Sequence, residues 1–115
     1  MVEFAVVMDK LSSFDTADDL ADFFRGYGIK AQPRNARACA ISQFVTEETG
    51  LKGIVTNTTA VTVYTDEMEQ YCSFHQNHTE AMMDFVERYD MGYYPDLIQN
   101  GYEYVVAAEN LNYCE

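Results

Sequence analysis

Several features are scarce in this sequence: it has no tryptophan, two prolines, three cysteines and no long hydrophobic run. No apolar stretch approaches the roughly 20 residues that a membrane-spanning helix needs, and no signal-peptide pattern opens the chain. Cys39, Cys72 and Cys114 are odd in number and far apart, whereas secreted disulfide scaffolds carry dense and usually even sets. We therefore expect a soluble protein of a reducing compartment and assign it to the cytoplasm.

Basic residues are also scarce, because nineteen acidic residues face only seven basic ones and the formal net charge is −12. Nucleic-acid binders and proteins that bind anionic membranes depend on excess lysine and arginine. The charge therefore argues against direct binding to nucleic acid or membrane. It is also uneven: residues 1–22 have a net charge of −5, residues 23–52 of +3 and residues 53–115 of −10.

The length of 115 residues fits one domain, and a hydrophobic content of 48% is ordinary for a globular protein. There is no repeat, low-complexity tract or linker. We expect a single acidic globular domain over residues 1–115.

The spacing of apolar residues predicts two helices in the first third of the chain. Residues 2–11 fit either a helical face or a strand, and the continued 3.6-residue period favours a helix. Thr16 is the expected N-cap of the second helix, with Asp18 and Asp19 in its first turn. Gly26 and Gly28 should end that helix.

Two more helices are predicted further along the chain. The third should begin near Pro33, a residue suited to a first helical turn, and close at Gly50. The fourth should cover residues 80–89 after a cap at Asn77 or Thr79. Pro95 should open one further turn over residues 96–99.

Strand signals lie between these helices. Two β-branched runs, 53–56 and 60–64, flank a polar loop and predict an antiparallel hairpin. Residues 66–78 are polar with large side chains at a spacing of three, which predicts a short helix. A third strand is expected near residues 102–106. The fold class is therefore α+β, with about four helices packed on a short antiparallel hairpin.

No set of residues predicts catalysis, a cofactor or a bound metal. Cys72, His75 and His78 form one cluster of metal-binding types, but a structural zinc site needs four ligands and no second such pair exists. The chain has no nucleophile–base arrangement and no glycine-rich phosphate loop. Cys39 should be a core residue rather than a reactive thiolate. We expect a protein that is not an enzyme.

Acidic residues recur at helical spacing and form the predicted binding surface. The second predicted helix and the residue before it place four acids on one face, and the fourth predicted helix places three. Four residues of helix rise are roughly 6 Å, the order of the spacing between phosphates on a strand. The predicted acidic surface consists of Asp15, Asp18, Asp19, Asp22, Asp66, Glu67, Glu69, Glu80, Asp84 and Glu87.

Tyrosines are concentrated near the end of the chain, where six of the nine fall in the last 27 residues. Tyrosine is enriched in binding surfaces because it gives rigid contact area with a polar tip. The predicted aromatic contacts are Tyr93, Tyr94, Tyr102 and Tyr104.

These features favour a small non-catalytic interaction protein that occludes the basic groove of a nucleic-acid-binding protein. In size and charge it is similar to the nucleic-acid-mimic inhibitors of phages and mobile elements, although no family motif is present. One alternative is a homo-oligomer in which the basic stretch 25–52 meets the acidic ends of another copy. Another is a phosphate or nucleic-acid contact through Arg34 and Arg37, placed at the start of the third helix.

Overall fold

The computed structural model describes residues 2–65 and 71–100. The elements follow in the order α1 (Phe4–Ser12), α2 (Ala17–Tyr27), α3 (Ala40–Thr49), β1 (Ile54–Thr56), β2 (Ala60–Tyr64), β3 (Cys72–Asn77), α4 (Glu80–Asp90) and the 3₁₀ turn η1 (Pro95–Leu97). The α+β class is confirmed, with four helices and a three-stranded antiparallel sheet among the described residues. The expected strand near residues 102–106 lies outside them.

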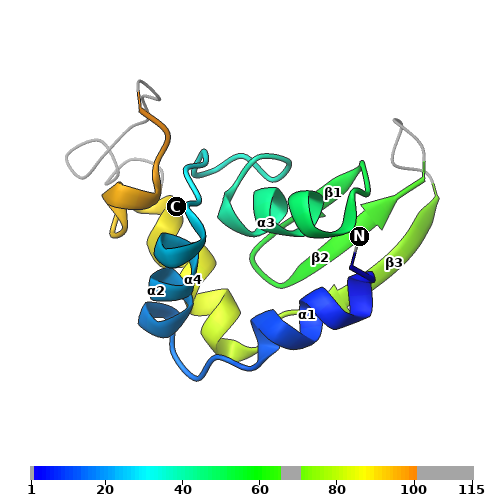
Figure 1. Ribbon diagram of the computed structural model, residues 1–115, viewed down its shortest axis with the longest axis horizontal. Helices are drawn as coiled ribbons and strands as arrows, with labels where there is room; N and C mark the ends of the chain where they lie inside the picture. Colours follow the sequence, from blue (N-terminus) through cyan, green and yellow to red (C-terminus); the bar gives the residue numbers. More distant parts are fainter. Residues whose placement is uncertain (1, 66–70, 101–115) are drawn as a thin grey trace.

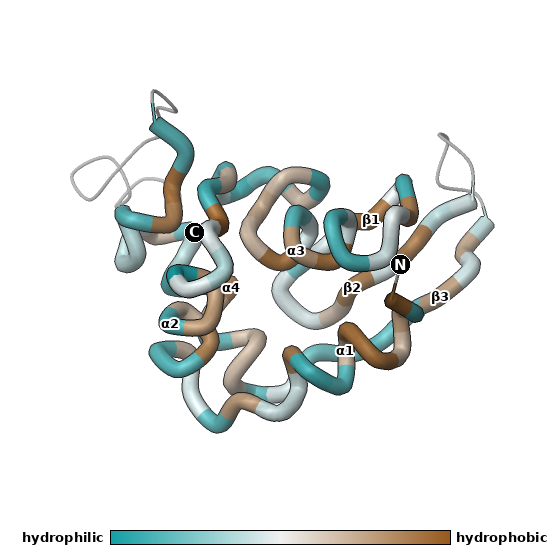
Figure 2. The backbone as a smooth tube through the Cα atoms, viewed as in Figure 1, coloured by the Kyte–Doolittle hydropathy of each residue, from teal (hydrophilic) through white to brown (hydrophobic). Residues whose placement is uncertain are grey.

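The helices divide into two groups in space (Figure 1). α2 and α4 pack side by side at one end of the molecule, while α1 and α3 pack together and α3 also contacts β1. Hydrophilic and hydrophobic residues alternate along α1 and α2 in Figure 2, as expected for helices with one buried face.

The core is built around one buried phenylalanine from each helix: Phe4, Phe24, Phe44 and Phe85. The ring centroid of Phe24 lies 5.6 Å from that of Phe44 and 5.3 Å from that of Phe85. Phe24 therefore joins α2 to both α3 and α4. Such aromatic pairs add to the stability that burial of their surface already gives.

The predicted hairpin is confirmed. β1 pairs with β2 in an antiparallel register that sets Ile54 opposite Val63. In the connecting loop, the Oδ1 atom of Asn57 accepts the N–H groups of Thr59 at 2.9 Å and of Ala60 at 2.9 Å. This side-chain turn replaces the Asn-Gly turn that the sequence lacks.

The first, second and fourth helices form where the periodicity places them. Thr16 caps α2 and Gly28 closes it in the left-handed conformation, while Gly26 lies inside the helix. Of the two residues expected to cap α4, Thr79 is the cap. The predicted turn after Pro95 is present as η1.

The predicted start of the third helix near Pro33 is wrong, because α3 begins at Ala40. Arg34 adopts a left-handed φ of 61°, which does not belong to a right-handed helix. The Oδ1 atom of Asn35 accepts the N–H of Arg37 at 3.2 Å. Such local side-chain bonds compete with helical ones, so the chain reaches Cys39 before it turns into the helix.

The predicted short helix over residues 66–78 is also wrong where the structure describes it, because Cys72–Asn77 form β3. β3 pairs with β2, and the register shifts between Val63 and Tyr64. Two side-chain contacts fix the strand: Phe74 stacks on Phe4 at 5.2 Å between centroids, and His75 Nδ1 lies 2.9 Å from Thr62 Oγ1.

Candidate interaction surface

The acidic residues of α2 are positioned by its N-cap. The Thr16 side chain accepts the N–H of Asp19 at 3.0 Å, so the helix begins immediately after it. Asp15, Asp18, Asp19 and Asp22 are all exposed. Carboxylates in the first turn are favoured by the helix dipole, which accounts for Asp18 and Asp19 without any binding role.

The acidic residues of α4 are arranged in the same way. The Thr79 side chain accepts the N–H of Met82 at 3.3 Å, and Glu80 occupies the first turn. Glu80, Asp84 and Glu87 are exposed along one face while Phe85 and its apolar neighbours face inward. The sequence pattern predicts this division between the faces.

One hollow brings acids of both segments together. Its volume is about 610 Å³, and its lining includes Asp15 just before α2 and Glu80, Asp84 and Glu87 of α4. Thr58 and Thr59 of the β1–β2 loop line the same hollow. Since α2 and α4 pack against each other, parts of the two acidic rows lie beside one another. We name the hollow lined by Asp15, Glu80, Asp84 and Glu87 the acidic hollow.

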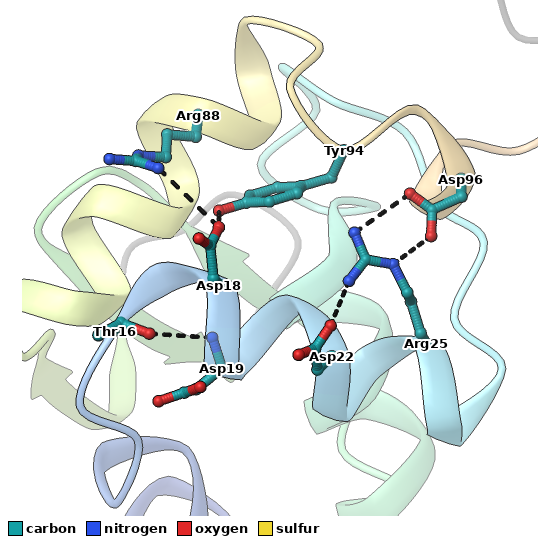
Figure 3. A network of polar contacts seen from close by, with 8 residues as sticks. All are labelled: Thr16, Asp18, Asp19, Asp22, Arg25, Arg88, Tyr94 and Asp96. Carbon is teal, nitrogen blue, oxygen red and sulfur yellow. Dashed lines mark hydrogen bonds and ion pairs between the residues drawn. The ribbon is translucent and has the colours of Figure 1, made fainter.

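Arg88 bridges the two rows. Its Nε atom lies 3.3 Å from Asp84 Oδ1. Its Nη1 atom lies 3.9 Å from Asp18 Oδ1, a contact that Figure 3 shows. The Coulomb attraction of Asp84 is the main cause that raises the pKa of Arg88. Arg88 thus reduces the repulsion between the helices, which like charges on neighbouring surfaces would otherwise create.

The far end of the α2 row is paired differently. The Arg25 guanidinium contacts both Asp22 and Asp96, and its NH2 atom lies 3.4 Å from Asp96 Oδ1 (Figure 3). The hydrogen bond from Arg25 lowers the pKa of Asp96. Asp22 therefore belongs to an ion-pair cluster that connects α2 to η1, at a distance along α2 from the acidic hollow.

The predicted aromatic contacts have different environments. Tyr93 is 60% exposed, whereas Tyr94 is only 5% exposed. The ring of Tyr94 stacks on Phe85 at 5.4 Å between centroids, and its hydroxyl donates to Asp18 Oδ1 at 2.8 Å. Burial is the main cause that raises the pKa of Tyr94 to about 12. Tyr94 therefore orients Asp18 from within the core.

Five of the predicted site residues lie outside the described part of the chain: Asp66, Glu67, Glu69, Tyr102 and Tyr104.

The basic stretch contacts acids of its own chain. Lys30 Nζ bonds to the backbone carbonyl of Asp96. The backbone N–H of Arg34 donates to Asp90 Oδ1 at 2.8 Å, and its Nε atom donates to the Asp90 carbonyl at 3.2 Å. Burial raises the pKa of Asp90. Because α3 begins at Ala40, Arg34 and Arg37 precede it and do not form the predicted anion site at a helix N-terminus.

The cysteine and histidine residues are separated. Cys72 and His75 are exposed on β3, whereas His78 is buried and its Nδ1 atom lies 3.0 Å from the Thr58 carbonyl. Within the described ranges, no three His, Cys, Asp or Glu side chains come together as a metal site. Cys39 is buried, as predicted, and burial raises the pKa of its thiol.

Two contributors to the surface were not anticipated. Arg88 is the only basic residue after position 52, and its i, i+4 spacing from Asp84 was a signal that could have identified the pair. Thr58 and Thr59 line the acidic hollow because the β1–β2 hairpin positions their loop there, and no local sequence pattern indicates this position.

In the part of the chain that the structure describes, no helix is long and apolar enough to cross a membrane.

Comparisons with protein-family models, with curated proteins and with solved structures give no match to this chain.

Proposed function

We propose that this protein is a non-catalytic inhibitor that places its acidic surface in the basic groove of a nucleic-acid-binding protein. The observation that supports the proposal is the acidic hollow, in which Asp15 joins Glu80, Asp84 and Glu87. Two rows that are separate in the sequence thereby contribute to one negative surface.

The mechanism is charge complementarity. Exposed carboxylates occupy positions that phosphates take in the groove, and the basic partner attracts the chain, whose net charge is −12, over long range. Association should therefore be fast and sensitive to salt. Tyr93, which is 60% exposed, adds contact area at the rim.

Internal pairing makes the acids unequal. Asp22 contacts Arg25 and Asp18 lies near Arg88, so these two carboxylates are partly compensated. Among the described residues, Glu80 and Glu87 form no ion pair. We infer that Glu80 and Glu87 carry more of the attraction than Asp18 or Asp22.

The experiment begins by capturing the partner from the native host with the full chain and identifying it by mass spectrometry. A mobility-shift assay at about 0.15 M salt, where the screening length is about 8 Å, then measures DNA release from that partner. The unmodified protein should not shift DNA alone and should release DNA from the partner in competition.

Two double variants of equal charge change locate the surface. Glu80→Gln with Glu87→Gln should weaken the competition, while Glu3→Gln with Asp9→Asn, changed at exposed positions on and beside α1, should leave it close to the unmodified level. Direct binding of DNA by the protein would contradict the proposal. Equal loss in both variants would show that total charge, rather than the acidic hollow, matters.

A further inference from the structure

β3 is an edge strand with an exposed outer side among the described strands. The strand order is β1-β2-β3, so β3 is paired on one side only among the described strands. Five of its six residues are exposed, and Gln76 is half-buried. An unpaired strand edge presents a row of N–H and C=O groups that can pair with another strand.

The hydrogen-bond pattern identifies which backbone groups face outward. The N–H of His78 donates to the Thr59 carbonyl at 2.7 Å, which marks that pair as hydrogen-bonded. Bonded and non-bonded pairs alternate along an antiparallel ladder. In the register that sets His75 opposite Thr62 and Asn77 opposite Ala60, His75 and Asn77 are therefore in non-bonded pairs and direct their backbone groups away from β2.

Two of the usual protections against pairing, charged side chains and proline, are absent from this strand. The strand Cys72–Asn77 has the sequence CSFHQN, without lysine, acid or proline, although 23% of the whole chain is charged. Natural edge strands are commonly protected by charged side chains, by proline or by a covering element. A second copy would therefore meet no like charge on the strand itself.

An apolar surface adjoins the same edge. Phe74 is 46% exposed and Val2 is 37% exposed. Phe74, Val2 and Leu51 line a hollow of about 460 Å³ between the start of α1 and the sheet. Two strands paired about a two-fold axis would bring Phe74 of each copy to the same face of the joined sheet.

We propose that β3 pairs with β3 of a second copy in an antiparallel arrangement, which joins the three described strands of each copy into one continuous sheet. A two-fold axis makes the interface self-complementary, and a strand without charged residues suits this symmetry. The opposing force is the repulsion between two chains that each carry a net charge of −12. Salt should therefore strengthen the dimer, because it screens the chains while the strand pairing does not depend on charge.

The dependence on salt distinguishes this dimer from the alternative oligomer, in which the basic stretch 25–52 pairs with the acidic ends of another copy. Salt should strengthen the β3–β3 dimer, whereas it should weaken the oligomer held by opposite charges. Sedimentation of the full chain should be followed from about 0.1 M to about 1 M salt, which shortens the screening length from about 10 Å to about 3 Å. The mass should rise from 13.1 kDa towards twice that value. A mass that stays at 13.1 kDa, or that falls with salt, would overturn the proposal.

Hydrogen exchange supplies a readout for individual residues. The amides of His75 and Asn77 should exchange more slowly at high protein concentration, because pairing with the second copy protects them. Those of Phe74 and Gln76 already face β2 and should change little. Equal protection at all four positions would contradict the pairing.

Substitutions test the edge directly. His75→Lys puts a like charge on the outer strand of each copy, where the two edges meet, and should raise the dissociation constant about tenfold or more. Thr46→Lys, at an exposed position of α3, adds the same charge elsewhere and should not weaken the dimer. Asn77→Pro removes an outward N–H without removing a bond to β2, and it should also weaken the dimer. A dimer that is unchanged in both edge variants would refute the assignment.

Discussion

Substitution of Gly53 by alanine should lower the stability of the fold strongly, although it adds only one methyl group. It precedes β1 with a φ of 80°, and a Cβ placed there would lie 2.5 Å from the carbonyl oxygen of Tyr64. The N–H of Tyr64 also donates to the Gly53 carbonyl at 3.0 Å. The two backbones therefore approach so closely that a methyl group requires β1 and β2 to separate.

The magnitude for Gly53→Ala follows from three contributions. The left-handed conformation costs alanine about 1–2 kcal/mol, and a methyl group forced into a packed site costs about 1–3 kcal/mol. The lower entropy of the unfolded chain offsets about 0.4–1 kcal/mol. We expect a net loss of about 1–5 kcal/mol, centred on about 3 kcal/mol, in the free energy of unfolding.

Two other glycines provide matched controls for the same substitution. Gly28 has a φ of 90° but nothing within 4 Å of its Cβ position, so Gly28→Ala should lose only about 1 kcal/mol from the conformational contribution. Gly26 lies inside α2 with open space around it, so Gly26→Ala should gain about 0.5–1 kcal/mol. Denaturant unfolding followed by circular dichroism gives all three values.

The order of the three alanine variants is the test. Gly53→Ala must be the least stable and Gly26→Ala the most stable. If Gly53→Ala lost no more stability than Gly28→Ala, the close contact with Tyr64 would not be present in the folded protein. The described position of the hairpin, and with it the position of Thr58 in the acidic hollow, would then be wrong.

Two further predictions concern titration and charge. Burial lowers the pKa of His78 from its ordinary 6.5, so the unfolded chain binds more protons below about pH 6.5 and stability should fall as pH decreases through that value. Thermal unfolding between about pH 5 and pH 8 should show this fall, and His78→Gln should reduce it; a fall that is unchanged in His78→Gln would contradict the assignment. Arg88→Gln leaves Asp18 and Asp84 without their shared cation, so it should lower the melting temperature at low salt by an amount that shrinks as salt is added. Lys52→Gln makes the same charge change at an exposed position, and an equal effect in both variants would contradict the bridging role of Arg88.

The sequence predicts the helices well where periodicity and caps agree. Thr16 and Thr79 each precede a clear apolar period, and each caps a helix at the expected position. The start of α3 could not be found in this way, because Ala36 and Ala38 continue the apolar pattern before Ala40. What prevents a helix there is the left-handed Arg34 and its bonds to Asp90, a contact 56 residues distant in the sequence.

β3 shows a second limit of local patterns. Its residues have no β-branched side chain and no apolar alternation, so nothing within Cys72–Asn77 indicates a strand. The strand forms because of β2. β1 pairs with one side of β2, and the backbone of β3 forms hydrogen bonds with the other side. Phe74 then stacks on Phe4 of α1. Contacts with β2 and α1 therefore stabilise this strand, and its own sequence does not indicate it. For the same reason its outer edge can be polar.

The same distinction decides how the acidic rows should be understood. Helical spacing indicates that Glu80, Asp84 and Glu87 share a face of α4, since that depends on one helix alone, whereas Asp15 precedes α2 and is not placed by the spacing of that helix. It cannot indicate that Asp15 meets Glu80 and Glu87 at one hollow, because this depends on how α2 packs on α4. Nor can it show that Arg88 of α4 also lies near Asp18 of α2, because that contact joins two helices. For the proposed inhibitor function, the net charge of −12 is therefore a poor measure of binding strength. The number of uncompensated carboxylates at one hollow is the quantity to which the proposed partner should respond.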